Sequence, residues 1–144
     1  MKMRKLALAF VYLGILFWVA ATRAETAPSS LDGEWCNERV GCSFFWSRFL
    51  VRTQAPNIIE ISHPLESGRW RLNFRGTVTG KNFSGTWYPY GADLDCGVRN
   101  SRSAAGTIEG RKIIIHLPVL PGGTCNEPNK YPPVQASTLV LVPR

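Results

Sequence analysis

The sequence contains few of the residues on which catalysis and metal binding usually depend. It has two histidines, His63 and His116, and no Gly-x-Ser-x-Gly nucleophile motif or metal-binding histidine pair. Asp93 and Asp95 lie close together, but two carboxylates without further placed ligands do not make a calcium site. We therefore expect a protein that is not an enzyme and that holds no metal and no cofactor.

Cysteine is also scarce, and its spacing excludes a further class of site. None of the four cysteines has a partner at the close spacing typical of structural zinc sites. In an exported chain an even count predicts two disulfides instead, for which four cysteines allow three pairings. The strand register described below favours Cys96–Cys125, which leaves Cys36–Cys42 to close a short loop.

The sequence has one long hydrophobic run, Leu6 to Ala21. Basic residues precede this run, and a short segment with small residues follows it and ends at Ala24. A membrane-spanning helix needs roughly 20 apolar residues, so this shorter run is typical of an export signal. We expect residues 1–24 to be a signal peptide, 25–30 a flexible leader and 31–144 a single folded domain. The protein is then predicted to be secreted or periplasmic, with no membrane contact after signal cleavage.

The positive charge of the chain is partly a property of this signal. The whole sequence carries 17 Lys and Arg against 10 Asp and Glu, a net charge of +7. Four of the basic residues and none of the acidic ones lie in residues 1–24, which leaves 13 against 10 in the remainder. A nucleic-acid partner, which a strongly basic domain would suggest, is therefore not expected.

The chain after the leader lacks a clean helical period and shows the alternation of antiparallel strands. Gly80-Lys81 fits a two-residue turn that sets Thr79 opposite Asn82 and Phe74 opposite Trp87. The two faces of this hairpin then separate by polarity, so one is predicted to be buried and the other wet. The predicted inner face is Trp70, Leu72, Phe74, Gly76, Val78, Phe83, Gly85 and Trp87; the outer face includes Arg69, Arg71, Asn73, Arg75 and Tyr88.

A second hairpin follows the same pattern around Gly110-Arg111. This turn sets Glu109 opposite Lys112 and Ile108 opposite Ile113. Small residues on one strand then face large ones on the other, which suits a curved interior. The same register, extended along both strands, places Cys96 opposite Cys125 and favours that disulfide.

The remaining strands are predicted at Leu31–Cys36, Phe45–Thr53, Ile58–Ser62 and Thr138–Val142, with Phe44–Val51 assigned as strand although it is aromatic on both faces. A turn at Gln54-Ala55-Pro56 is expected to pair Val51 with Ile59 and Phe49 with Ile61. About eight strands in up-and-down order favour an all-β protein with one closed antiparallel barrel, because closure removes exposed edges. An open β-sandwich is the alternative.

The first predicted strand carries a Gly-x-Trp motif, Gly33-Glu34-Trp35, in a short barrel with an export signal. In this the chain resembles the calycin superfamily of lipocalins, avidins and small bacterial protease inhibitors. The resemblance implies that Trp35 closes one end of the barrel beneath a basic side chain of the last strand, a position that Arg144 could occupy. Its length fits the avidin-like or inhibitor-like barrels better than typical lipocalins.

Two binding functions follow as hypotheses. In the first, the inner-face residues Trp35, Trp70, Phe74 and Trp87 hold a small apolar or aromatic ligand inside the barrel. In the second, the barrel is a filled scaffold, and a secreted protein such as a hydrolase binds to disulfide-pinned loops and an Arg/Tyr surface. The residues expected on that surface are Arg71, Arg75, Tyr88 and Tyr131, the last within the Pro/Gly-rich segment 118–136.

Overall fold

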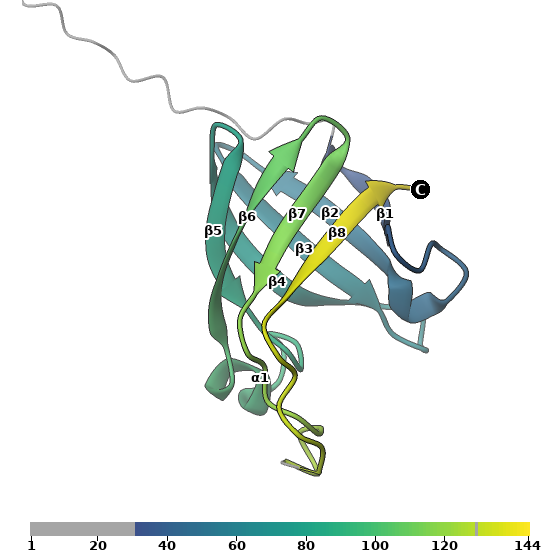
Figure 1. Ribbon diagram of the computed structural model, residues 1–144, viewed down its shortest axis with the longest axis vertical. Helices are drawn as coiled ribbons and strands as arrows, with labels where there is room; N and C mark the ends of the chain where they lie inside the picture. The colour runs from purple at the N-terminus through teal and green to yellow at the C-terminus, as the bar shows by residue number, and fades with distance from the viewer. Residues whose placement is uncertain (1–30, 129) are drawn as a thin grey trace, which may run out of the picture.

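The chain forms an all-β closed barrel of eight antiparallel strands in up-and-down order (Figure 1). The computed structural model describes residues 31–128 and 130–144, so the predicted signal peptide and leader lie outside the described residues. The strands are β1 (Gly33–Asn37), β2 (Arg48–Gln54), β3 (Ile58–Pro64), β4 (Trp70–Thr79), β5 (Asn82–Trp87), β6 (Arg102–Glu109), β7 (Lys112–Leu117) and β8 (Ser137–Pro143). β1 pairs with β8, so the barrel is confirmed and the open sandwich is not.

Both glycine-first hairpins have the register that the sequence predicts. Thr79 pairs with Asn82 and Phe74 with Trp87 across β4 and β5, and Gly80 has a φ of +62°. Glu109 pairs with Lys112 across β6 and β7. Glycine accommodates this positive φ without a steric cost, so the two turns fix the register of half the barrel.

The β2–β3 hairpin differs from the prediction by two residues. Val51 pairs with Ile61 and Thr53 with Ile59, because the turn residues are 55–57 rather than 54–56. A shift of two residues keeps each side chain on its predicted face of the sheet, so the inward set is unchanged.

The chain before β2 is a short 3-10 helix rather than strand, η2 (Phe45–Ser47). Three consecutive aromatic residues, Phe44, Phe45 and Trp46, leave the barrel here and are exposed. The prediction that the strand begins at Phe45 was therefore wrong. Successive side chains of a strand point to opposite faces of the sheet. Some of these rings would then have pointed into the barrel, where the core is already filled.

The barrel interior is a single apolar cluster. Its buried members are Leu31, Trp35, Phe49, Val51, Ile59, Ile61, Phe74, Val78, Phe83, Trp87, Ala104, Ile108, Ile113, Ile115 and Leu141. Phe74 and Phe83 meet edge to face at a centroid distance of 5.5 Å. Their rings occupy space above Gly76 and Gly106, where a Cβ atom would lie within 2.6 and 2.3 Å of a ring carbon. These glycines allow two large rings to fill the centre.

A β-bulge changes the direction of the side chains at the start of β4. The β3–β4 register shifts between Ile61 and Ser62, so that Asn73 is an additional residue on β4 and both Asn73 and Phe74 are buried. The predicted alternation from Trp70 to Phe74 is therefore wrong. Beyond the bulge, Arg71 pairs with His63, and Trp70 pairs with Pro64 and is half-buried outside the core cluster.

The two disulfides join the cysteines that the sequence paired. Cys36–Cys42 closes the connection between β1 and β2, with Cα atoms 5.1 Å apart, and Cys96–Cys125 spans 5.7 Å. The second pair does not form by extension of the β6–β7 ladder, which ends at Ala105 and His116. Cys96 lies instead on the short helix α1 (Asp95–Arg99), below the barrel in Figure 1. Within the residues that the structure describes, no helix has the length and hydrophobicity to cross a membrane.

Candidate binding site at the loop end of the barrel

The connections at one end of the barrel carry the exposed large hydrophobic side chains. We call this the loop end; it comprises the segments between β1 and β2, β3 and β4, β5 and β6, and β7 and β8. Among the residues that the structure describes, the exposed large hydrophobic ones are Phe44, Phe45, Trp46, Val98, Val119, Tyr131 and Val134, and all seven lie in these segments. The gathering of apolar side chains at one end is typical of an interaction surface, whereas single exposed ones are not.

The aromatic residues before β2 are held in a fixed position. Phe44 and Trp46 stack with centroids 5.2 Å apart and an interplanar angle of 13°. Ser47 is fully buried, and its hydroxyl oxygen lies 2.6 Å from the Gly41 carbonyl oxygen and 2.7 Å from that of Phe44, so its single proton is shared between these two acceptors. With Cys36–Cys42 closing the same loop, the exposed rings lose little further conformational entropy when they bind a partner.

The segment 118–136 is tied to the β5–β6 connection and to itself. Cys125 is joined to Cys96, and the Tyr90 hydroxyl donates to the Gly122 carbonyl oxygen at 3.2 Å. Leu120 and Val134 form a reciprocal pair of backbone hydrogen bonds at 2.9 Å. Tyr131 remains exposed on this segment. Backbone and disulfide contacts thus fix a proline-rich loop that presents an aromatic side chain.

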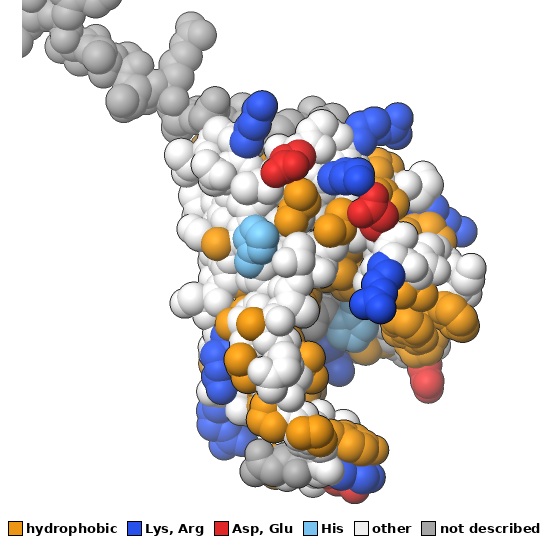
Figure 2. All heavy atoms as spheres, in the orientation of Figure 1, with side chains coloured by type: hydrophobic (Ala, Val, Ile, Leu, Met, Phe, Trp, Pro, Cys, Tyr) orange, Lys and Arg blue, Asp and Glu red, His pale blue; other side chains and the backbone are white. Residues whose placement is uncertain are grey.

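Between these two surfaces lies a cavity of about 270 Å³, which we call the end hollow. Its lining residues are His63, Arg71, Pro89, Tyr90, Leu94, Thr124, Cys125 and Asn126. Figure 2 shows the molecule hollowed between the hydrophobic side chains near η2 and those of the lower loop. Residues of β3 and β4 and of the β5–β6 and β7–β8 connections therefore meet at one concave place.

A buried asparagine on the bulge organises the polar groups of the end hollow. Asn73 is 4 % exposed; its Nδ2 donates to the Tyr88 carbonyl oxygen at 2.9 Å, and its backbone oxygen accepts from the Tyr88 N–H at 2.6 Å. Because the Tyr88 carbonyl can only accept, the amide orientation is fixed and Asn73 Oδ1 faces His63 Nδ1. His63 Nδ1 is therefore the protonated nitrogen, and Nε2 remains for other partners.

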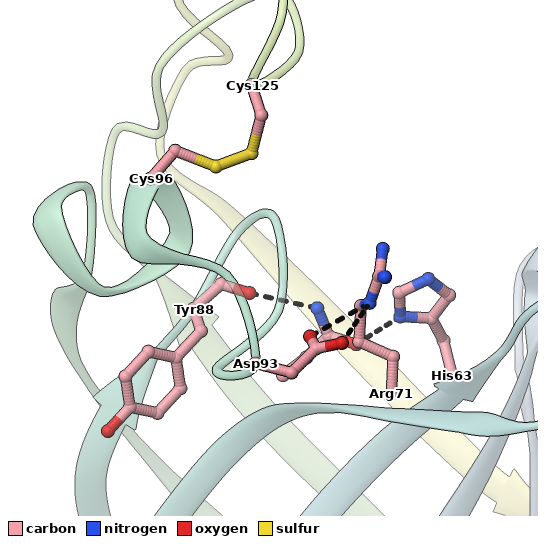
Figure 3. A network of polar contacts seen from close by, with 7 residues as sticks. His63, Arg71, Tyr88, Asp93, Cys96 and Cys125 are labelled. Atoms are coloured by element: carbon pink, nitrogen blue, oxygen red, sulfur yellow. Dashed lines mark hydrogen bonds and ion pairs between the residues drawn. A yellow bond between two sulfur atoms is a disulfide. The ribbon is translucent and has the colours of Figure 1, made fainter.

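Arg71 is the cation of the end hollow. Its Nε lies 3.0 Å from Asp93 Oδ1 and 3.3 Å from Asp93 Oδ2, and its side chain is 25 % exposed. Gly91 lies against its aliphatic stem, where a Cβ atom would come within 2.2 Å of Arg71 Cδ. In Figure 3 the terminal nitrogens of Arg71 and the free nitrogen of His63 both extend toward the side on which Cys125 lies.

The residues predicted to bind a ligand are only partly together. Trp35, Phe74 and Trp87 lie in the packed core with exposures of 3 %, 0 % and 7 %, and Trp35 Nε1 donates to the Leu31 carbonyl oxygen at 2.8 Å. Trp70 is separated from them by the bulge. The side chains expected to line one cavity thus pack against one another or lie elsewhere.

The residues predicted to form one Arg/Tyr surface are also divided. Arg71 lies in the end hollow, whereas Arg75 is outside it and pairs with Glu60 at 3.2 Å. Tyr88 contributes its backbone to the polar network, and its ring extends away from Arg71 and His63 (Figure 3). Tyr131 is exposed on the segment 118–136.

The sequence interpretation did not identify the aromatic cluster or the roles of His63 and Asn73. Three adjacent aromatic residues at 44–46 were a usable signal, because a strand can bury only alternate ones. The positions of His63 and Asn73 depend on the bulge, and no turn residue marks it. Shallow depressions on the outer face of β4–β7, lined mainly by Thr, Ser and Ala, bring together no comparable group of polar side chains.

Comparisons with known proteins give no family for this chain: no family model, no curated protein and no solved structure matches it. Within the described residues, no group of three or more His, Cys, Asp or Glu side chains is arranged to hold a metal ion. The arguments for function therefore rest on the loop end itself.

Proposed function

We propose that the protein is an exported, non-enzymatic binding protein that captures a secreted partner protein, such as a hydrolase, at its loop end. The observation that carries this proposal is the location of the exposed large hydrophobic residues, which within residues 31–128 and 130–144 all lie in the loop-end connections. Aromatic residues in rigid settings are enriched among the side chains that contribute most to protein binding. The stacked Phe44–Trp46 pair and Tyr131 are therefore the expected main contacts.

The alternative, a small apolar ligand inside the barrel, has less support. An eight-stranded barrel is just wide enough for side chains to fill it, and here Trp35, Phe74 and Trp87 belong to one packed cluster. We also propose membership of the calycin superfamily, supported by the barrel topology and by Trp35 on β1. Arg144 lies on the neighbouring strand end, where its guanidinium pairs with Glu34.

Export is proposed from the expected signal peptide and is consistent with the two disulfides, which persist in oxidising compartments. The same setting supplies hydrolases as candidate partners. Inhibition requires no chemistry from the inhibitor itself, only a rigid surface that blocks the partner's active site.

The test is a binding and inhibition assay of the purified exported protein against a panel of secreted proteases, glycosidases and lipases. Trp46→Ala and Tyr131→Ala should each weaken capture of the responsive hydrolase about tenfold or more, as expected for main contacts. Lys81→Ala, in the turn at the opposite end, is the matched control and should leave capture unchanged. All three variants should keep the thermal midpoint of the parent.

Two outcomes would contradict the proposal. One is capture that is equally strong in all the loop-end variants. The other is saturable binding of an apolar fluorescent probe with a blue shift of tryptophan emission, while no hydrolase is bound, which would support the interior ligand.

A further inference from the structure

The geometry points to a carboxylate as the group that the end hollow binds, held by the terminal guanidinium nitrogens of Arg71 beside the His63 ring. The inference deepens the proposed function and rests on it where the carboxylate belongs to a partner protein. It concerns the chemistry of one cavity, whereas the proposed function rests on the exposed rings of the loop end.

The first step is the donor capacity that Arg71 retains. A guanidinium has five N–H donors in a planar fork, and both contacts to Asp93 run through Nε alone. The terminal nitrogens point into the end hollow in the direction of Cys125 (Figure 3). The two nitrogens on this edge of the guanidinium are spaced so that each can donate a hydrogen bond to one oxygen of a carboxylate.

The second step is the charge of the end hollow. Asp93 is 57 % exposed and Arg71 only 25 %, so water screens the carboxylate more than the guanidinium. The remaining residues of the lining, among them His63 and Tyr90, include no carboxylate. The groups inside the cavity therefore favour an anion, although Asp93 lies at its edge.

The third step is that the Arg71 guanidinium and the His63 ring beside it are held in place before a ligand arrives. Asn73 fixes the His63 ring through Nδ1 and is itself fixed by Tyr88. Asp93 and the close approach of Gly91 hold the Arg71 side chain. Binding then requires little reorganisation, which is the condition under which a small number of polar contacts gives measurable affinity.

The last step is size. Pockets for drug-sized ligands have volumes of about 300–1,000 Å³, and the end hollow, at about 270 Å³, is smaller. It suits a single acidic side chain, a chain terminus or a small free acid. These sources share one chemistry, and an experiment can separate them.

The experiment is an NMR titration of the exported protein, following the side-chain nitrogen resonances of Arg71 and His63 at constant ionic strength. The probes are acetate and the peptide acetyl-Ala-Glu-Ala-amide, with acetamide and acetyl-Ala-Gln-Ala-amide as their neutral matches. We expect both carboxylates to shift these resonances saturably and both neutral probes to leave them unchanged. Tighter binding of the Glu peptide would identify a protein partner as the source, and tighter or equal binding of acetate a free acid.

The matched variants are Arg71→Gln and Arg75→Gln. Both arginines lie on β4 and pair with a carboxylate, but only Arg71 lines the end hollow. Arg71→Gln should weaken acetate binding about tenfold or more, since it removes a charged donor pair, and Arg75→Gln should weaken it less than about twofold. If Arg71→Gln loses the dispersed spectrum of the folded protein, Arg71→Lys serves instead, because it keeps the charge and removes the planar fork.

The inference is overturned if acetamide shifts the resonances as acetate does, or if the Arg71 and Arg75 variants weaken binding equally. It stands if acetate binds as expected while Trp46→Ala and Tyr131→Ala leave hydrolase capture intact. In that case the proposed function fails alone, because the acetate titration involves no partner protein.

Discussion

The two ends of the barrel are built in opposite ways. One end, which we call the turn end, has connections of two or three residues at 55–57, Gly80-Lys81 and Gly110-Arg111. Leu31 is buried there and accepts the Trp35 indole hydrogen bond. The loop end has the long connections, both disulfides, the exposed rings and the end hollow.

The difference shows where this fold places stability and where it places binding groups. Short turns and a packed core allow one end to hold the strands in register, while the other end presents side chains that contribute little to that register. Loops on a rigid scaffold commonly carry function for this reason. Substitutions at the two ends should therefore separate loss of stability from loss of binding.

The largest expected effect is on the packed core that the turn end closes. Phe74→Ala would remove a ring that is fully buried and in edge-to-face contact with Phe83. We expect the free energy of unfolding to fall by about 3–5 kcal/mol, because the transfer and cavity costs add. Urea denaturation would measure this fall. If Phe74→Ala lowered the free energy of unfolding by less than Trp46→Ala does, the contrast between the two ends of the barrel would be contradicted.

The next effect concerns the disulfides of the loop end. Replacing both Cys96 and Cys125 by Ser should cost about 2–5 kcal/mol of stability. The residues of this pair are 29 apart in sequence and those of Cys36–Cys42 only 6 apart, so the chain-entropy model predicts a cost about 1.4 kcal/mol larger for the longer loop. Thermal unfolding of the two double variants tests the order, which equal midpoints would refute.

A smaller effect is expected at the bulge, where the scaffold meets the end hollow. Asn73→Ala removes the partner of His63 Nδ1 and one donor to the Tyr88 carbonyl, at a cost of about 1–3 kcal/mol. Asn82→Ala, exposed beside the β4–β5 turn, is the control and should change stability by less than about 0.5 kcal/mol. The acetate affinity should fall only in the first variant, and a fall in both would show that the bulge does not organise the site.

The smallest effect on stability is expected for the exposed rings. Trp46→Ala removes an exposed side chain stacked on Phe44, so the free energy of unfolding should change by less than about 0.5 kcal/mol. Chemical denaturation with the same slope as the parent would confirm it. A loss of several kcal/mol would mean that the aromatic cluster belongs to the scaffold and not to a binding surface.

Most of the barrel was predictable because local chemistry determines it. Gly80 and Gly110 mark the turns, and period-two alternation then assigns each residue of β4–β7 above the bulge to a face. The β2–β3 turn was placed one residue too early because Pro56 fits more than one turn position. The error left the core intact, since a two-residue shift preserves the faces.

The candidate site was less predictable because it depends on one inserted residue and on long connections. The bulge at Asn73 is a tertiary feature, and it transferred Arg71 from the expected outer face to the end hollow. The pairing of Cys96 with Cys125 was predicted correctly, but the reason given was wrong, since α1 and the segment 118–136 bring the two residues together. Contacts between segments without regular structure leave no periodic trace in a sequence.

The position of Arg144 has a practical consequence. The Arg144 N–H donates to the Glu34 carbonyl oxygen at 3.0 Å, and Arg144 shares a surface depression with Leu31 and the Gly110-Arg111 turn. Attachment of the chain to a sensor chip through this residue would orient every molecule the same way, with the aromatic loops toward the flowing solution. Kinetic measurements on such a layer would then be free of the heterogeneity that random coupling through lysines introduces.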